Sequence, residues 1–147
     1  MVSAMPDRKF VVGRITLSDR AAAGVYEDAS GPEIERVLRE FFEEEMEFRA
    51  CVLPDQRDQI EQALRDFIAA EIPLIVTTGG TGPSARDVTP EATRAVAGVA
   101  GHSLIINLPG RPTAIAECLA LIAPAIAECL DHVAGWRPKL AADKNSR

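Results

Sequence analysis

The chain has 147 residues, of which 47% are hydrophobic and 5% aromatic, and a net charge of −6 at pH 7. This length favours one domain over residues 1–147 with a sizeable core and loose termini at 1–9 and 137–147, and the acidic balance argues against nucleic-acid binding. The chain does not open on a signal-peptide pattern and no apolar run approaches the roughly 20 residues of a bilayer span, so we expect a cytoplasmic protein that enters no membrane.

The first element is an apolar run over Phe10–Leu17, which predicts a strand that ends in the polar triplet Ser18-Asp19-Arg20. Residues 21–29 show no periodicity and predict a loop. Ser30 and Glu33 then stand at capping-box spacing before a helical pattern of apolar residues. The sequence therefore predicts a strand, a loop and an amphipathic helix in this order.

Three more short apolar runs predict strands over residues 48–53, 74–78 and 103–108. Helical patterns separate the four strands, and the chain contains no internal repeat. This alternation favours a three-layer α/β/α sandwich around a mostly parallel sheet.

The remaining helices are predicted from their caps and apolar stripes. Asp55 or Asp58 is suited to capping a helix after the second strand, and Thr89-Pro90 opens a short helix in the favoured way. A stripe over residues 115–133 predicts a long final helix. Pro124 inside this stripe implies a kink or two helices end to end.

The third strand leads into the loop Thr77-Thr78-Gly79-Gly80-Thr81-Gly82-Pro83, with Arg86 and Asp87 just beyond it. Glycine lets a backbone curl round an oxyanion and leaves N–H groups open to it. Taken alone, the loop is equally compatible with an ordinary Gly-rich turn. It lacks the Gly-Lys-Ser/Thr ending of a P-loop and the G-x-G-x-x-G spacing, so neither a standard NTPase nor a dinucleotide dehydrogenase is favoured.

All four predicted strands end in polar residues, which a parallel sheet brings to one edge. These ends are Ser18-Asp19-Arg20, Pro54-Asp55, the glycine loop with Arg86-Asp87, and Asn107-Leu108-Pro109-Gly110-Arg111. The acids Asp55 and Asp87 suit Mg²⁺, and the glycine amides, hydroxyls and arginines suit phosphates, which indicates phosphoryl or nucleotidyl transfer. Singly, each residue also has a structural interpretation, with Asp55 as a helix cap, Asp87 in a turn and Asn107 ending a strand.

The three cysteines, Cys51, Cys118 and Cys129, lie far apart and form no Cys-x-x-Cys pair, so the sequence supports neither a disulfide framework nor a zinc site. Cys118 and Cys129 are 11 residues apart on one helical pattern, so we expect both to be small core residues.

The order of these motifs resembles the molybdopterin-binding (MogA/MoaB) family, to which the gephyrin G domain is related. The matching segments are residues 18–31, Leu53-Pro54-Asp55, the glycine loop with residues 86–92, and Asn107-Leu108-Pro109-Gly110. They cover nearly the whole chain. The Ser18-Asp19-Arg20 triplet with Gly24-Val25-Tyr26, and the tail Trp136-Arg137-Pro138-Lys139, are more similar to the adenylyltransferase branch than to the MoaB-like one.

This resemblance implies a cytosolic, usually trimeric enzyme of molybdenum-cofactor synthesis. Such enzymes transfer AMP from Mg·ATP to the terminal phosphate of molybdopterin, and their product goes to a downstream molybdenum-insertion protein. By the resemblance, Asp55 and Asp87 are the essential acids and metal ligands. The expected residues for ATP and molybdopterin are Ser18, Asp19, Arg20, Thr77, Thr78, Gly79, Gly80, Thr81, Gly82, Pro83, Asn107, Pro109 and Gly110. A non-catalytic molybdopterin carrier or scaffold and a MoaB-like paralogue remain alternatives.

The chain departs from the family pattern at one place. Between Ala97 and Gly98 the family has a further segment of a few tens of residues, with a Pro-Gly-Phe motif and a Ser-Arg pair that help to form the pterin site. This segment is absent from the sequence, which leaves two interpretations: either the protein has lost one wall of its pocket, or the sequence lacks a flexible segment that the protein has.

Overall fold

The computed structural model describes residues 9–80 and 99–142, and within them it contains one five-stranded sheet with the strand order β2-β1-β3-β5-β4. β1, β2, β3 and β5 run parallel, and the short β4 pairs antiparallel with β5. The strands span Phe10–Leu17 (β1), Met46–Leu53 (β2), Leu74–Gly79 (β3), Val99–Ala100 (β4) and Ser103–Leu108 (β5).

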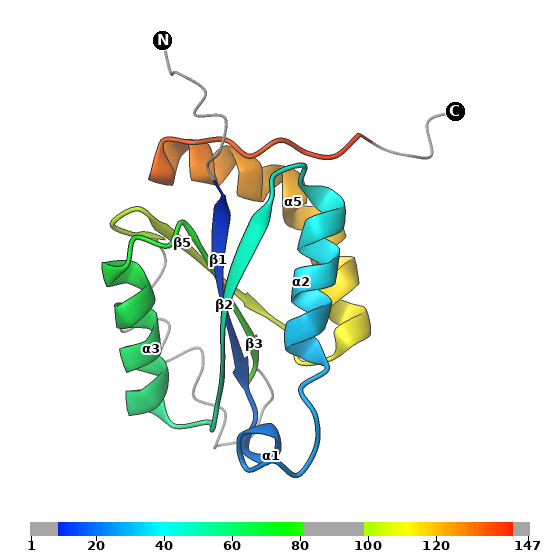
Figure 1. Ribbon diagram of the computed structural model, residues 1–147, viewed down its shortest axis with the longest axis vertical. Coiled ribbons are helices and arrows are strands. Elements are labelled where there is room, and N and C mark those ends of the chain that lie inside the picture. The colour runs from blue at the N-terminus through cyan, green and yellow to red at the C-terminus, as the bar shows by residue number, and fades with distance from the viewer. Residues whose placement is uncertain (1–8, 81–98, 143–147) are drawn as a thin grey trace.

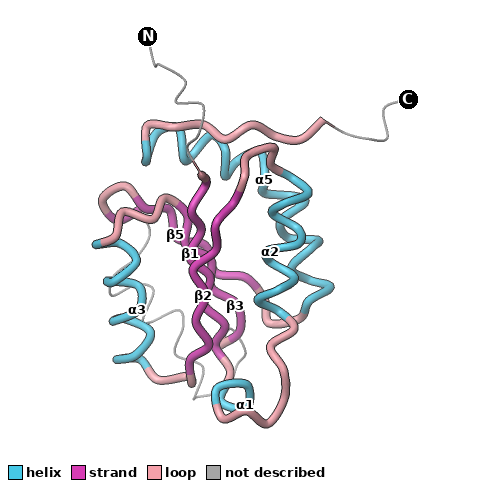
Figure 2. Tube along the Cα trace, viewed as in Figure 1, coloured by secondary structure: helices cyan, strands magenta, loops and turns pink. Residues whose placement is uncertain are grey.

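Helices cover both faces of this sheet. In the described residues they are α1 (Asp19–Ala22), α2 (Ser30–Phe41), α3 (Arg57–Ala69) and α5 (Pro112–Ala134). Figure 1 shows α3 on one face and α2 with α5 on the other, and Figure 2 shows the strands between these helical layers. The predicted three-layer α/β/α sandwich around a mostly parallel sheet is confirmed.

Side chains of β1 alternate between two hydrophobic cores, because successive residues of a strand point to opposite faces of the sheet. Phe10 and Val12 pack with α2 and α5, whereas Ile15 and Leu17 pack with α3. Burying a large aliphatic or aromatic side chain contributes about 1.5–3 kcal/mol. The two cores therefore hold all three long helices on the sheet.

The predicted strands agree closely with the observed ones. β1 and β5 have the predicted bounds, β2 begins at Met46 rather than Phe48, and β3 continues to Gly79. The periodicity does not predict β4, because two residues carry no pattern. The helix predicted at Thr89-Pro90 lies outside the described residues.

Two helix starts differ from their predictions. α1 begins in the polar triplet after β1 and continues into the first two residues of the predicted loop, Ala21 and Ala22, and Ser18 caps it by accepting a hydrogen bond from the Ala21 N–H at 3.2 Å. α2 begins at Ser30, but its N-cap is Ala29 and makes no side-chain capping bond. The Ser30 hydroxyl instead donates to the Gly110 carbonyl at 2.6 Å. The predicted capping box is therefore wrong, and the serine links α2 to the loop after β5.

The later helices also correct the sequence predictions. α3 begins after Gln56 without a side-chain capping bond, so the predicted caps Asp55 and Asp58 are wrong. α5 is a single helix of 23 residues with Pro124 inside it, which excludes two helices end to end. Figure 1 shows α5 changing direction along its length, as expected where proline removes a helix hydrogen bond.

By length and composition alone, α5 would be able to cross a membrane, contrary to the sequence expectation that no segment approaches this length. Its mean hydropathy is 1.7. Its buried stripe, which includes Ile115, Leu119, Ile126 and Leu130, packs into the core shared with α2. This packing gives α5 a structural role in the sandwich.

The segment after α5 packs against the rest of the protein, so the predicted loose tail is wrong for residues 137–141. The Trp136 ring lies edge-on to Phe10, with 4.8 Å between the ring centroids. The Lys139 carbonyl accepts a hydrogen bond from the Glu43 N–H at 2.9 Å. These contacts tie the C-terminal segment to the beginning of β1 and the end of α2.

The three cysteines have different surroundings. Cys51 packs against the core under α3 and Cys118 against the core under α2 and α5, whereas Cys129 is exposed. The prediction that Cys129 is a core residue is therefore wrong. The 11-residue spacing does keep residues of α5 on one face, as the buried pairs Ile115 with Ile126 and Leu119 with Leu130 show, but Cys118 and Cys129 lie beside this buried stripe and not within it.

Burial raises the pKa of the Cys51 thiol, which lowers its thiolate fraction at neutral pH. At about pH 7.5 we expect iodoacetamide to modify Cys129 first and Cys51 last, and we expect the reaction of Cys51 to become faster as the pH is raised to about 9. Peptide mass spectrometry of a labelling time course measures this order. Modification of Cys51 as fast as that of Cys129 at the lower pH would contradict the prediction.

Candidate active site

The four parallel strands end level with one another. Leu17 at the end of β1 is paired with Leu53 of β2 and with Gly79 of β3, and Thr78 is paired with Leu108 of β5. The residues that follow these strands therefore meet along one edge of the sheet, as the sequence predicts. β1 lies between β2 and β3, and such a reversal of strand order is where open α/β sheets bind ligands.

A cavity of about 540 Å³ opens at this edge. It is lined by residues 16–21 and 26–30, by Asp55, by residues 78–80, and by Gly110 with Pro112. Small-molecule sites have volumes of roughly 300–1,000 Å³, so this cavity is large enough to hold a nucleotide-sized ligand in part or whole.

Most of the predicted site residues that the structure describes line this cavity. They are Ser18, Asp19, Arg20, Asp55, Thr78, Gly79, Gly80 and Gly110. They come from the ends of β1, β2, β3 and β5, so the folded chain brings together residues up to 92 positions apart in the sequence. Thr81, Gly82, Pro83 and Asp87, together with Arg86, lie outside the described residues.

Thr77, Asn107 and Pro109 do not line the cavity. Thr77 is fully buried, and its hydroxyl donates to Asn107 Oδ1 at 2.6 Å. Because side chains alternate along β3, the next residue, Thr78, points to the other face and donates to the Pro109 carbonyl at 2.7 Å. These two hydrogen bonds join the ends of β3 and β5 and so position the loops that do line the cavity.

Sequence analysis did not identify Thr16, Tyr26, Asp28 and Ser30 as site residues, although all of them line the cavity. In the sequence, Thr16 has the pattern of a residue inside a strand and Ser30 that of a helix cap. Neither position therefore indicates a ligand. The available signal is the loop over residues 21–29, which lacks periodicity and directly follows the polar end of β1, as binding loops often do.

Gly79 allows the end of β3 to approach β1 closely. Its φ is +87°, a conformation that residues with a side chain rarely adopt. A Cβ at this position would overlap the carbonyl oxygen of Leu17 on β1. Glycine is therefore required where β3 turns into the loop that was predicted to bind phosphate.

A partly buried cluster of charged groups holds the loop before α2. Asp28 Oδ2 accepts hydrogen bonds from Arg14 Nη1 at 3.1 Å and from Thr16 Oγ1 at 2.9 Å, and Asp28 Oδ1 accepts one from the Gly31 N–H at 2.9 Å. Arg14 Nε also donates to Glu35 Oε2 at 2.8 Å. Through these contacts the cluster joins β1 to α2 and fixes a loop that lines the cavity.

Replacing Arg14 with methionine should lower the free energy of unfolding by about 2–4 kcal/mol, because this guanidinium is only 12% exposed: Asp28, 14% exposed, would lose its cation, and Glu35 would keep only Arg39 at 3.8 Å. Urea unfolding followed by circular dichroism measures this loss. The matched control is Arg36→Met, which removes exposed ion pairs to Glu33 and Glu40 and should leave stability near that of the wild type. Equal effects of the two substitutions would show that the Arg14 cluster does not hold the structure.

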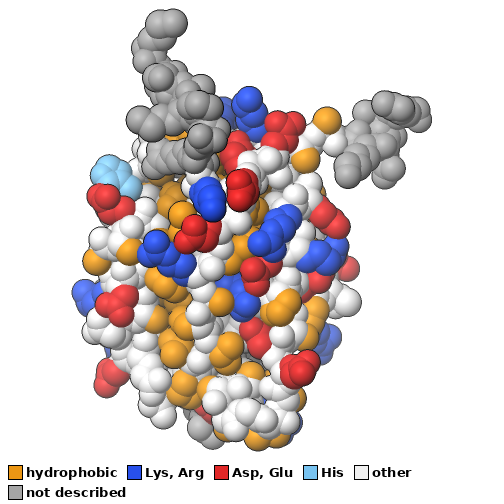
Figure 3. Space-filling model, in the orientation of Figure 1, with side chains coloured by type: hydrophobic (Ala, Val, Ile, Leu, Met, Phe, Trp, Pro, Cys, Tyr) orange, Lys and Arg blue, Asp and Glu red, His pale blue; other side chains and the backbone are white. Residues whose placement is uncertain are grey.

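The charges around the cavity suit both a metal ion and phosphates. Among the described lining residues, Asp19, Glu27, Asp28 and Asp55 are acidic and Arg20 is basic. Helices α2 and α5 both begin at the cavity, where their N-termini present partial positive charge to an anion. On the face that Figure 3 shows, acidic and basic side chains are interspersed and form no continuous basic area.

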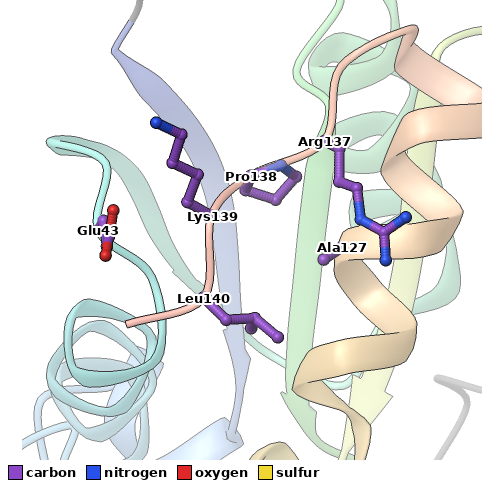
Figure 4. Close-up of a pocket in the computed structure, with 6 residues that line it drawn as sticks. All are labelled: Glu43, Ala127, Arg137, Pro138, Lys139 and Leu140. Atoms are coloured by element: carbon purple, nitrogen blue, oxygen red, sulfur yellow. The ribbon is translucent and has the colours of Figure 1, made fainter. Parts of the chain in front are cut away.

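A second cavity, of about 360 Å³, lies between the C-terminal segment and α5, near the end of the sheet where β1 begins (Figures 1 and 4). It is lined by Glu43, Ala127, Arg137, Pro138, Lys139 and Leu140. No residue predicted for the site lies there, and the edge where the strands end is the usual ligand-binding edge of such a sheet. We therefore place the candidate site in the first cavity.

The fold and this cavity define a class of protein, namely an open α/β protein with a ligand-sized cavity at the carboxyl ends of its parallel strands. The particular family follows from comparison with known sequences. A family model described as "Probable molybdopterin binding domain" matches residues 13–104. The chain belongs to this molybdopterin-binding domain family, which confirms the resemblance seen in the motifs.

Similar proteins carry specific names. The chain is 40% identical to the molybdopterin adenylyltransferase of Helicobacter pylori (strain J99), and the match covers 84% of this chain and 88% of that protein. It is 32% identical to the molybdopterin adenylyltransferase of Escherichia coli (strain K12), with 82% of this chain and 77% of that protein covered.

Among solved structures, the molybdopterin biosynthesis enzyme MoaB from Thermus thermophilus superposes with a TM-score of 0.81 at 32% identity. That match covers 88% of this chain and 99% of the other. A MogA structure superposes with a TM-score of 0.77, also at 32% identity, and covers 84% of this chain and 99% of the other. The architecture is thus shared with both branches of the family.

The chain is also 30% identical to gephyrin of Dictyostelium discoideum, and the match covers 99% of this chain and 25% of that protein.

Proposed function

We propose that this chain is a molybdopterin adenylyltransferase of molybdenum-cofactor synthesis, which transfers AMP from ATP to the phosphate of molybdopterin and releases pyrophosphate. The observation that carries the proposal is one cavity that combines the glycines at the end of β3, the beginnings of α2 and α5, and the carboxylate of Asp55. The names of the relatives at 32–40% identity support the same activity.

The reaction asks mainly for positioning and charge stabilisation. The attacking phosphate is already ionised at neutral pH, so no strong general base is needed, and the protein has to hold two anions in line while their repulsion is offset. Gly79 and Gly80 allow a phosphate to approach the backbone closely. The beginnings of α2 and α5 and the Arg20 guanidinium add positive charge around it.

Magnesium fits the same cavity. Mg²⁺ in nucleotide sites is held by one or two carboxylates, by substrate phosphates and by water. Asp55 lines the cavity, and its backbone N–H donates to Asp19 Oδ1 at 3.0 Å, which fixes this position of the chain. No group of three or more His, Cys, Asp or Glu side chains that could hold a metal occurs within residues 9–80 and 99–142. We propose, from the family resemblance, that Asp87 would be the second carboxylate beside Asp55 and the phosphates. When bound, the ion neutralises the charge of the phosphates.

The assembly and cellular setting are further parts of the proposal. From the family resemblance we propose a homotrimer that acts in the cytoplasm and passes its product to a molybdenum-insertion protein. Light scattering of the purified protein should give three times the mass of one chain. The mass of a single chain would contradict the proposed trimer but would not contradict the proposed reaction.

The test of the activity is turnover of the purified protein with molybdopterin and ATP. We expect pyrophosphate release that requires both molybdopterin and Mg²⁺, and a product with the mass of adenylated molybdopterin. Removing Mg²⁺ with a chelator should abolish both signals.

A second candidate is a molybdopterin carrier or scaffold, which would use the same cavity for binding alone. A carrier would bind molybdopterin but release no pyrophosphate with Mg·ATP. The same absence of turnover would fit a MoaB-like paralogue, because the MoaB structure superposes with a TM-score of 0.81 against 0.77 for the MogA structure, both at 32% identity.

A further inference from the structure

Tyr26 is an aromatic side chain held at the wall of the candidate-site cavity. It belongs to the loop between α1 and α2 and lines the cavity, yet 51% of the residue is exposed. Its hydroxyl forms a hydrogen bond with Ser18 Oγ at 2.8 Å, so the ring is tied to the end of β1. Among the lining residues that the structure describes, it is the one aromatic residue.

The loop that carries Tyr26 is fixed on both sides of it. On the α1 side, the Val25 N–H donates to the Arg20 carbonyl at 2.9 Å and the Gly24 N–H to the Ala21 carbonyl at 3.1 Å. On the α2 side, Asp28 accepts its three hydrogen bonds from Arg14, Thr16 and the Gly31 N–H. A ring fixed in this way before a ligand arrives lowers the cost of ordering it on binding.

The surroundings of the ring leave room for a flat ligand. Gly79, Gly80 and Gly110 line the same cavity and have no side chains to fill it. The other lining groups are mostly polar or charged and suit phosphates and a metal, whereas an aromatic face suits a base-like ring, because stacking needs no particular hydrogen-bond pattern. The cavity thus offers different chemistry to the two ends of a phosphorylated heterocycle.

We propose that Tyr26 stacks on the flat nitrogen heterocycle of a substrate, adenine or pterin, and that the cluster of Arg14 and Asp28 keeps it in position. This inference rests on the proposed function, because both substrates of that reaction carry such a ring. Stacking makes and breaks no bond, so Tyr26 determines binding rather than the rate of the chemical step. Its loss raises KM and leaves kcat within about threefold.

The test compares variants by equilibrium dialysis with three probes: Mg·ATP, 6-hydroxymethylpterin and Mg·tripolyphosphate. Tyr26→Leu should weaken binding of at least one of the two heterocycles about tenfold or more and leave tripolyphosphate, which has no ring, unchanged. Tyr26→Phe keeps the ring without the bond to Ser18 and should bind within about threefold of the wild type. Val25→Ala is the matched control, because Val25 is 70% exposed in the same loop and does not line the cavity.

The outcomes separate the possible explanations. Weaker binding of ATP alone assigns the ring to adenine, and weaker binding of the pterin alone assigns it to pterin. Equal weakening of tripolyphosphate, or loss of binding in the phenylalanine variant, overturns the stacking role in favour of a structural one. Wild-type binding of both heterocycles by Tyr26→Leu overturns this inference alone, whereas a wild-type protein that binds neither heterocycle overturns the proposed function as well.

Discussion

Replacing Asp55 with asparagine should lower kcat for AMP transfer about 100-fold or more, and it should leave the fold intact. The substitution keeps the shape of the side chain but removes the negative charge that would hold Mg²⁺ in the cavity. Steady-state kinetics at increasing Mg²⁺ concentration measure this effect. We expect a high Mg²⁺ concentration to restore part of the lost rate, because the remaining ligands still bind the ion weakly.

The matched control for this experiment is Asp58→Asn. Asp58 lies in the first turn of α3, is exposed and does not line the cavity, so the same change of charge three residues away should have little effect on kcat. If Asp55→Asn and Asp58→Asn had the same kcat, Asp55 would not act in the reaction. Asp87→Asn tests the second predicted acid in the same assay.

Replacing Gly79 with alanine should lower the free energy of unfolding by about 3 kcal/mol or more. One part of this loss comes from the backbone, because a residue with a side chain adopts a φ of +87° only at a free-energy cost of about 1–2 kcal/mol. The other part is the overlap of the new Cβ with the Leu17 carbonyl, which forces β3 and β1 apart at the edge of the cavity. Urea unfolding measures the sum, and ATP binding should weaken in parallel because the cavity wall has moved.

A control variant separates the two parts of this cost. Gly101 also has a positive φ, of +57°, but a Cβ there would meet open space. Gly101→Ala should therefore cost only the conformational part, about 1–2 kcal/mol. If the two substitutions were equally destabilising, the close approach of Gly79 to β1 would not contribute to stability.

The fold was predictable from the sequence because its signals are local. Each long strand is an apolar run with polar residues at its carboxyl end, and each long helix has an apolar stripe. The rule that parallel strands end at one edge then places Ser18, Asp55 and Gly79 together without any knowledge of side-chain contacts. The register of the strands confirms this placement.

The sequence analysis did not identify the site residues whose position depends on contacts between distant parts of the chain, because no local sequence pattern contains such contacts. In the sequence, Arg14 is recognisable only as a polar residue that interrupts an apolar run, because its partners Asp28 and Glu35 lie 14 and 21 residues away. Ser30 has the spacing of a capping box, yet its hydroxyl bonds to a carbonyl 80 residues further along the chain. Tyr26 becomes a candidate only when the loop is seen to lie against the cavity.

The central claim is that the adenylyl group of ATP, rather than its terminal phosphate, moves to molybdopterin. The most direct test incubates the purified protein with molybdopterin, Mg²⁺ and ATP labelled either on the α-phosphate or on the γ-phosphate, and follows the label by mass spectrometry. The account predicts that the α-label appears in molybdopterin with the added mass of AMP and that the γ-label appears only in pyrophosphate. Transfer of the γ-label to molybdopterin, or no transfer by a protein that binds both substrates, would contradict it.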